Sequence, residues 1–232
     1  MSKKGVAVLS GERRPWRDTW APRDNAKFGR DTKVQIREHV LEVLGAATAH
    51  VFDAYAGEGQ MYSAIWKHAA SYVGVTETWH NDERCCFVGD NKRVLRAIDL
   101  APFNVFDLDA YGSPWDALGI VAARRPRMQK GERLGILITE GTWLKTRARD
   151  PVRGMREVLP KKLVTPIPYS VHDAMIARAL ERFVWQMGGR VIKAWRAVGT
   201  TGARVRYIGV VVEATGKASP EPLPEPEPEP EP

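Results

Sequence analysis

The sequence has 232 residues, of which 44% are hydrophobic, and this composition is that of one soluble globular domain. No apolar stretch is long enough to cross a bilayer and no apolar core follows the basic N-terminus, so we expect a cytoplasmic protein with no membrane partner. The two cysteines, Cys85 and Cys86, are adjacent, which excludes a disulfide scaffold and indicates a reducing compartment. The formal net charge is +7, although residues 219–232 hold five glutamates and no basic side chain. A body this basic favours a polyanionic partner, most often nucleic acid.

Residues 1–30 are predicted to form a basic N-terminal arm, because prolines and charges interrupt every regular pattern there. Arginine alternates with tryptophan in this arm, a combination that suits phosphate contacts together with base stacking. An arm that packs its tryptophans on the domain is an equally good interpretation. The arginines that the first interpretation assigns to nucleic acid are Arg13, Arg14 and Arg17.

From residue 31 onward, segments with helical spacing alternate with short apolar runs that are typical of buried strands. Asp31 is expected to cap the first helix, and Gly45 to end it. This alternation predicts a parallel sheet covered on both faces, and the last two strands form an antiparallel hairpin. The expected helices are 31–44, 60–70, 92–100, 115–124 and 171–187, and the expected strands are 49–54, 72–77, 85–88, 103–108, 134–139, 190–197 and 204–212.

The predicted fold class is therefore α/β, with a Rossmann-like, doubly wound, mostly parallel seven-stranded sheet and a C-terminal antiparallel hairpin. This domain covers residues 31–216. Residues 217–232 are rich in proline and glutamate, cannot build a core, and are predicted to be a disordered tail.

The first strand ends in an acid and two glycines, in the segment 53–59 that reads Asp-Ala-Tyr-Ala-Gly-Glu-Gly. Gly57 and Gly59 let a ligand approach the backbone where a Cβ would collide. Asp53 can accept from the ammonium of a bound amino acid, directly or through water. The segment resembles the first motif of the class I S-adenosylmethionine-dependent methyltransferases, and this resemblance covers roughly residues 31–213. It implies S-adenosylmethionine as the cofactor, with Tyr55 among the residues that bind it.

Acids further along the chain complete the cofactor site that this resemblance implies. Glu77, at the end of the second strand, can accept both hydroxyls of a ribose. Asp90 stands where methyltransferases commonly recognise adenine; a turn aspartate is the alternative, and Asp99 replaces it if the third strand lies later. Asp107 is expected to point away from Asp109, because strand residues alternate between faces, and to meet the cofactor.

The second signature is the segment 107–114, which reads Asp-Leu-Asp-Ala-Tyr-Gly-Ser-Pro. It resembles the fourth motif of the tRNA guanine-N2 dimethyltransferases, and more distantly the Asp-Pro-Pro-Tyr loop of DNA amino-methyltransferases. Ala110 stands where both groups have proline, which loosens the turn that holds the target amine.

The resemblance implies catalytic roles for Asp109 and Tyr111. An exocyclic amine on a base is a poor nucleophile, so the protein mainly has to align its nitrogen with the methyl group and the sulfur. Asp109 would accept the amine N–H, a carbonyl near Ala110 would accept the second one, and Tyr111 would stack on an unpaired or flipped base. The alternatives are a capping aspartate and a core aromatic residue.

A basic connection follows the fifth strand, and Lys145, Arg147 and Arg149 in it are candidates to contact a polyanion; a solvated loop is the alternative. The five histidines show no metal-ligand spacing. The favoured function is S-adenosylmethionine-dependent methylation of an exocyclic amino group of a nucleic-acid base, with guanine N2 of RNA preferred over DNA. A DNA adenine-N6 or cytosine-N4 methyltransferase is one alternative, and a non-catalytic nucleic-acid-binding protein on the same fold is another.

Overall fold

The computed structural model describes residues 7–10, 26–141, 153–156, 158, 169–198 and 205–216. The strands are β1 (Ala7–Ser10), β2 (His50–Asp53), β3 (Ser71–Thr76), β4 (Cys86–Val88), β5 (Val105–Leu108), β6 (Arg133–Glu140), β7 (Gly189–Val198) and β8 (Arg206–Ala214). The helices are α1 (Ala26–Leu44), α2 (Gln60–Ala64), α3 (Asn91–Ala97), α4 (Trp115–Arg124), α6 (Arg153–Arg156) and α7 (Tyr169–Gln186), with short 3-10 turns η1 (Ala46–Thr48) and η2 (Trp66–His68).

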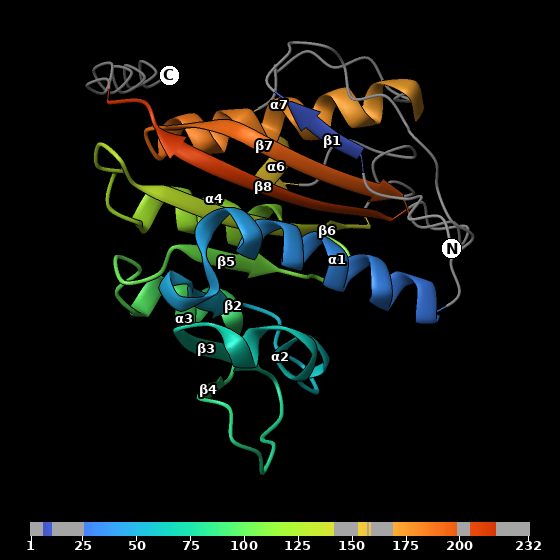
Figure 1. Ribbon diagram of the computed structural model, residues 1–232, viewed down its shortest axis with the longest axis vertical. Coiled ribbons are helices and arrows are strands. Elements are labelled where there is room, and N and C mark those ends of the chain that lie inside the picture. The colour runs from blue at the N-terminus through green and yellow to red at the C-terminus, as the bar shows by residue number, and fades with distance from the viewer. Residues whose placement is uncertain are drawn as a thin grey trace, which may run out of the picture.

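All these strands belong to one mixed sheet with the order β1-β7-β8-β6-β5-β2-β3-β4 (Figure 1). The five strands from β4 to β6 are parallel, whereas β8 is antiparallel to β6 and β7 is antiparallel to β8. The predicted doubly wound, mostly parallel sheet with a C-terminal hairpin is confirmed. An eighth strand, β1, extends the seven that the sequence predicts.

The sequence pattern predicts no regular element in residues 1–30, and this prediction is wrong at two places. β1 pairs antiparallel with β7, because the outer edge of β7 offers unpaired backbone groups to the short apolar run of β1. α1 begins at Ala26, so it crosses the boundary predicted at residue 30, and Asp31 lies exposed within the helix rather than at its cap. No proline follows Pro22 before the end of α1, so nothing stops the helix from starting earlier.

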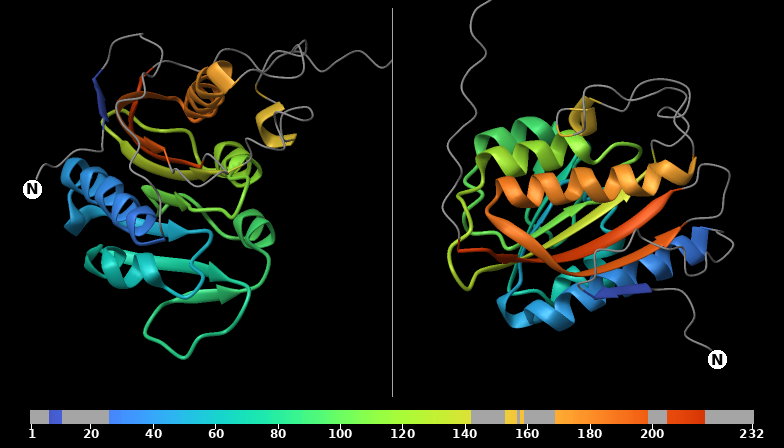
Figure 2. Two further views of the ribbon diagram at one scale, coloured as in Figure 1. Left: turned by 90° about the vertical axis from the view of Figure 1, so that its right-hand side faces the viewer. Right: turned by 90° about the horizontal axis from the view of Figure 1, so that it is seen from above.

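Helices cover both faces of the sheet, with α1 and α2 on one side and α3, α4 and α7 on the other (Figure 2). Each strand supplies both faces, as the pleat requires. On β2, Val51 packs in the cluster that includes Ile36 of α1, and Phe52 packs in the cluster that includes Leu118 of α4 and Phe183 of α7. Two hydrophobic layers therefore hold the sheet from opposite sides.

Gly209 of β8 lets α1 lie directly against the sheet. A Cβ at this position would lie 2.5 Å from Cγ2 of Ile36, which is closer than packed carbon atoms can approach. α1 runs antiparallel to the parallel strands: its early residues reach the carboxyl ends, and it then leads through η1 into the start of β2. This close packing positions the side chains of α1 at the candidate site. No helix among the described residues has the length and apolar character needed to cross a membrane.

Candidate active site

Three aspartates gather at the carboxyl ends of two neighbouring strands. Asp53 ends β2 and is the register partner of Asp107 on β5, and Asp109 follows two residues later. Arg37 of α1 donates to both Asp107 and Asp109, and these carboxylates therefore face α1 together. The prediction that Asp107 points away from Asp109 is wrong, because residues two apart along an extended chain share a face.

Arg37 anchors this arrangement. Its Nε and Nη2 atoms donate to the two oxygens of Asp107, each at 2.7 Å, and its Nη1 donates to the carbonyl oxygen of Lys33 at 2.9 Å. Trp66 Nε1 donates a further bond of 2.7 Å to Oδ2 of Asp107. The side chains of Arg37 and Asp107 are only 4% and 0% exposed. Burial opposes the charge of Arg37, but the two carboxylates outweigh it and hold the Arg37 pKa above its ordinary value.

Asp109 carries cations on both oxygens. Lys33 Nζ lies 2.7 Å from Oδ1, and Arg37 Nη2 lies 3.2 Å from Oδ2. Thr139 of β6 also forms a side-chain hydrogen bond with Asp109. Burial alone would raise the Asp109 pKa, but Arg37 and then Lys33 outweigh it and hold that pKa below the usual carboxyl value. Asp109 is therefore ionised at neutral pH and acts as a hydrogen-bond acceptor.

Asp53 has a different electrostatic environment. Oδ1 accepts from the backbone N–H of Tyr55 at 3.0 Å, and Oδ2 accepts from the hydroxyl of Tyr72 at 3.1 Å. Burial, and then the negative charge of Asp107, raise the pKa of Asp53 from 3.8 to about 8. Burial and the charge of Asp53 in turn raise the pKa of Tyr72. The protein therefore favours the protonated form of this carboxyl, and its side chain ties β2 to β3.

The two glycines after β2 serve different purposes. Gly59 has φ 80°, and a Cβ on it would lie 2.8 Å from Cζ of Arg84, whose Nη1 donates to the carbonyl oxygens of Ala56 (3.2 Å) and Gly57 (3.0 Å). A side chain at position 59 would collide with Arg84, so the position of Arg84 requires a glycine there. Gly57 has φ 44° and is exposed, and the nearest atom to a Cβ built on it lies 3.8 Å away. The open backbone at Gly57 fits the S-adenosylmethionine that the first motif implies, because a ligand can approach it closely.

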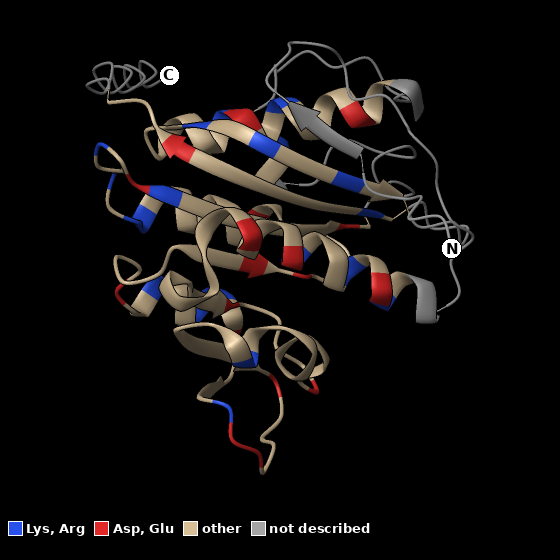
Figure 3. Cartoon of the chain, in the orientation of Figure 1, with Lys and Arg blue, Asp and Glu red and all other residues tan. Residues whose placement is uncertain are grey.

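Arg84 belongs to the segment between β3 and β4, which bears acidic as well as basic side chains (Figure 3). Its Nε donates to Oδ2 of Asp82 at 2.8 Å, so the arginine joins this segment to the glycine turn. Glu77, the first residue after β3, is exposed at the same carboxyl edge of the sheet. Tyr55 is half-buried against the core on the α4 side, and burial raises its pKa.

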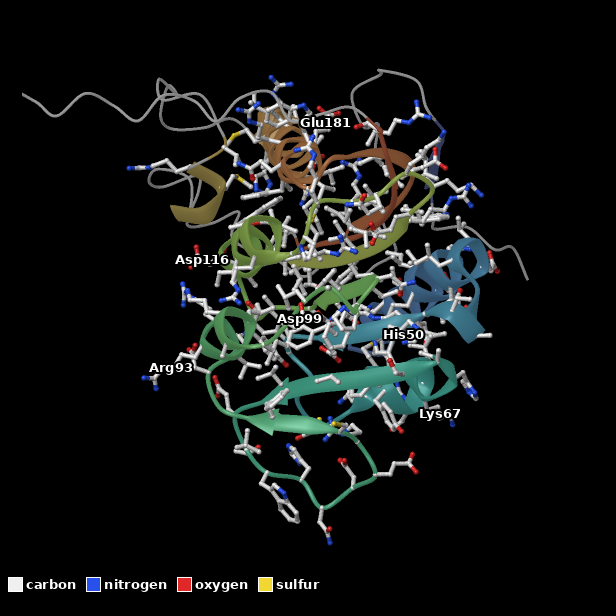
Figure 4. All side chains as sticks on the ribbon, turned by 90° about the vertical axis from the view of Figure 1, so that its left-hand side faces the viewer. His50, Lys67, Arg93, Asp99, Asp116 and Glu181 are labelled. Atoms are coloured by element: carbon white, nitrogen blue, oxygen red, sulfur yellow. The ribbon has the colours of Figure 1, made fainter. Side chains whose placement is uncertain are left out.

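Asp90 caps α3: its Oδ1 accepts from the backbone N–H of Arg93 at 2.8 Å, and Oδ2 is not used by this cap. The start of α3, where Asp90 lies, is at the carboxyl edge of the sheet. There the Lys92 ammonium pairs at 3.0 Å with Asp116 at the start of α4. In Figure 4, Arg93 and Asp116 lie at the opposite end of the sheet from His50 and Lys67. Asp99 follows α3, and Ala101, Pro102 and Asn104 after it line a hollow together with His50 at the start of β2.

The turn after β5 presents Tyr111 to solvent, with its side chain fully exposed. The core-aromatic alternative for this residue is therefore excluded. Ala110, where the related motifs have proline, uses its extra N–H to donate to the carbonyl of Leu108 at 2.9 Å, and its own carbonyl accepts from Gly112 at 3.0 Å. Gly141, just after β6, donates to the carbonyl of Gly112 at 2.9 Å. Local hydrogen bonds thus hold the turn that a proline would otherwise stiffen.

Several residues of this site belong to no sequence motif that would have predicted their place in it. They are Lys33 and Arg37 on α1, Trp66, Tyr72 and Arg84. A signal existed only for the first pair, since a lysine and an arginine four apart on a helix share one face. The predicted nucleic-acid contacts Arg13, Arg14, Arg17, Lys145, Arg147 and Arg149 lie outside the described residues.

A second group of buried charges adjoins the site. Asp173 of α7 accepts from Arg206 Nε at 2.7 Å and pairs with Arg196 at 3.0 Å. Glu140, next to Thr139 at the end of β6, lies 3.4 Å from Nε2 of His172. Burial, and then the charge of Arg206, lower the His172 pKa to about 4. Asp173 therefore fastens α7 to both strands of the β7–β8 hairpin.

Comparison with known proteins supports the fold. No model of a protein family matches the sequence, and no curated protein matches it significantly. Trm1 from Pyrococcus horikoshii, solved as a complex with S-adenosyl-L-methionine, is similar in structure, with a TM-score of 0.53 and 13% sequence identity. The match covers 93% of this chain and 62% of Trm1, so the chain spans less than two thirds of that protein. The chain has a class I methyltransferase fold.

Two further similar structures have lower scores. TYW2 from M. jannaschii in complex with AdoMet has a TM-score of 0.49 and 10% identity, covering 92% of this chain and 89% of that one. The putative methyltransferase yhhF from Escherichia coli has a TM-score of 0.43 and 12% identity, covering 91% and 100%. The likeness to Trm1, at a TM-score of 0.53, shows that this chain shares the fold of that protein.

Proposed function

We propose that this protein is an S-adenosylmethionine-dependent methyltransferase that acts on an exocyclic amino group of a nucleic-acid base, with guanine N2 of RNA as the favoured target. The observation that carries the proposal is the pairing of Asp53 with Asp107. It sets the glycine turn after β2 beside the turn that holds Asp109 and Tyr111. Those two turns come from the two segments that resemble methyltransferase motifs.

The cofactor would lie against the open backbone at Gly57, with Tyr55 nearby, Glu77 accepting from its ribose and Oδ2 of Asp90 accepting from its adenine. It would supply a methyl group already activated by the positive sulfur. The protein then has to align the target nitrogen with that methyl group. Asp53 accepts a hydrogen bond from Tyr72, and Asp107 accepts from Arg37. These two carboxyl groups would therefore hold the framework of the site together rather than contact the cofactor.

Asp109 would accept an N–H of the target amine and so orient the nitrogen lone pair toward the methyl group. Its carboxylate is a weak base, because Arg37 and Lys33 hold its pKa low, so its role is orientation rather than proton removal before transfer. The exposed ring of Tyr111 would stack on the base. A stacked base of this kind has to be unpaired or flipped from its helix.

The choice of nucleic acid rests on charge and on the second motif. The chain carries a formal charge of +7 despite its acidic tail, and Lys145, Arg147 and Arg149 follow the strand that ends beside Asp109. RNA is favoured because residues 107–114 resemble the tRNA guanine-N2 dimethyltransferases more closely than they resemble the DNA enzymes.

Cofactor binding is the first test. Isothermal titration calorimetry with S-adenosylmethionine should show binding to the wild type and none to Gly57→Arg, which fills the open space over the turn. Gly119→Ala is the matched control, since its added Cβ would make only an ordinary contact with Phe183 at 3.5 Å. A wild-type protein that does not bind would reject the enzyme and leave the non-catalytic alternative.

The substrate is tested by transfer of labelled methyl groups to total RNA, DNA and protein, followed by nucleoside digestion. We expect label in N2-methylguanosine and at least a hundredfold loss with Asp109→Asn, whose cofactor affinity should be unchanged. Label in N6-methyladenine or N4-methylcytosine of DNA would support the DNA alternative. Label in protein alone would contradict a nucleic-acid substrate.

A further inference from the structure

Lys33 contacts Asp109, and no motif in the sequence predicts this contact. Its Nζ lies 2.7 Å from Oδ1 of Asp109, and the two residues are 76 positions apart in the chain. The Lys33 side chain is 25% exposed, and its ammonium also lies 5.4 Å from the centre of the Tyr207 ring on β8. A partly exposed cation therefore rests on the carboxylate that the proposed reaction uses.

The two cations on Asp109 differ in how firmly they are held. Arg37 is buried, and its Nε and Nη2 atoms each donate a hydrogen bond to Asp107, which fixes the guanidinium. Its longer contact with Asp109 is made from that fixed position. Among the described residues the Lys33 ammonium donates to Asp109, and it stands at the end of a long, partly exposed side chain. The two oxygens of Asp109 offer about four lone-pair positions, and Lys33, Arg37 and Thr139 each use one of them, so one is left for another donor.

Resting on the function proposed above, we propose that Lys33 is a positioning residue that acts through Asp109, fixing the carboxylate so that its remaining lone pair accepts the N–H of a neutral aromatic amine. The charges of Asp107 and Asp109 are matched by those of Arg37 and Lys33. A protonated alkylamine would therefore find no unbalanced negative charge here, whereas an uncharged base amine requires only an acceptor. Lys33 thereby selects the class of amine.

Asp109 is surrounded by a small set of charged and polar groups. α1 contributes Lys33 and Arg37, β5 contributes Asp107, β2 contributes Asp53, and β6 contributes the uncharged hydroxyl of Thr139. Of these, Lys33 is the one that can be removed without leaving a buried carboxylate without its partner, since Asp107 keeps Arg37. Lys33→Ala therefore tests the contact with little effect on folding.

Three variants separate positioning from structure: Lys33→Ala, Lys33→Arg, and the control Lys67→Ala, an exposed lysine at the other end of the sheet (Figure 4). We expect Lys33→Ala to lower kcat/KM about tenfold with unchanged affinity for S-adenosylmethionine, the scale of one charged hydrogen bond. Lys33→Arg and Lys67→Ala should retain activity. Added propylammonium should restore the alanine variant, and potassium at equal ionic strength should not.

A readout independent of turnover is the pH titration of the Asp109 carboxyl carbon by NMR, assigned with Asp109→Asn. Because the cation favours the ionised form, loss of Lys33 should move this titration to higher pH and Lys33→Arg should leave it in place. An unchanged titration in Lys33→Ala, or activity equal to wild type without propylammonium, would overturn the inference. A wild type that transfers no methyl group overturns the proposed function instead, and the titration still decides whether Lys33 controls Asp109.

Discussion

Replacement of Arg37 by methionine should destabilise the protein strongly. Methionine keeps the length and the packing of the aliphatic part of the side chain but leaves the carboxylate of Asp107 buried with one hydrogen bond, that from Trp66. Removing one partner of a buried ion pair costs about 3–5 kcal/mol, because the other charge stays desolvated and uncompensated. At about 2–4 °C per kcal/mol for a domain of this size, the melting temperature should fall by about 6–20 °C.

The measurement is urea denaturation followed by circular dichroism at neutral pH, with thermal melts in parallel. Arg93→Met is the matched control, since Arg93 is exposed on α3 and its loss should change the free energy of unfolding by less than about 0.5 kcal/mol. The double variant Arg37→Met with Asp107→Asn should recover most of the loss, because it removes the buried charge. A loss below about 1 kcal/mol in Arg37→Met would refute the anchoring role of this pair.

Three further predictions concern Asp53, Gly209 and Asp90. Burial raises the pKa of Asp53 to about 8 in the folded protein, whereas the carboxyl of the unfolded chain titrates at about 3.8. Between these two pH values the folded protein holds a proton that the unfolded chain has lost, so the stability contributed by this group declines as pH rises through that range. Urea denaturation should therefore show Asp53→Asn gaining more stability over wild type at pH 8 than at pH 5, and an equal difference at both would contradict it. Gly209→Ala should cost about 1–3 kcal/mol by pushing α1 off the sheet, whereas Gly119→Ala in α4 should be neutral or stabilising in the same assay. Asp90→Ala should cost about 1 kcal/mol through loss of the α3 cap; Asp90→Ser should restore stability but not the calorimetric affinity for S-adenosylmethionine, and full affinity in Asp90→Ser would limit Asp90 to capping.

The sheet could be predicted because its signals are local. Val51 and Val105 belong to short apolar runs that end in acid and glycine, and such runs are readable one strand at a time. The position of β1 could not be read in this way, since it depends on an edge formed by β7, far along the chain. The same limit applies to Arg37, whose carboxylate partner is 70 residues away and becomes a neighbour only after α1 packs on β8.

The roles of single residues were harder to predict than their location. A Cβ on Gly59 would collide with Arg84, and Asp90 caps a helix, although the sequence predicts cofactor contacts for both residues. Both functions are structural uses of a residue type that a ligand site would also select. Tyr111 is the opposite case, since it is fully exposed and has no packing role in the core, and its proposed stacking on a base stays a prediction.

The candidate site is therefore completed by α1, a helix that precedes β2 in the chain. Without α1, Asp107 and Asp109 would lack the cations that pair with them. With α1 in place, Arg37 pairs with Asp107, and Arg37 and Lys33 hold the Asp109 pKa below its usual value, whereas burial and the charge of Asp107 raise the pKa of Asp53. A carboxylate held in this way is a fixed acceptor with little tendency to take a proton. That property suits a reaction whose rate depends on the alignment of a weakly nucleophilic nitrogen rather than on prior removal of its proton.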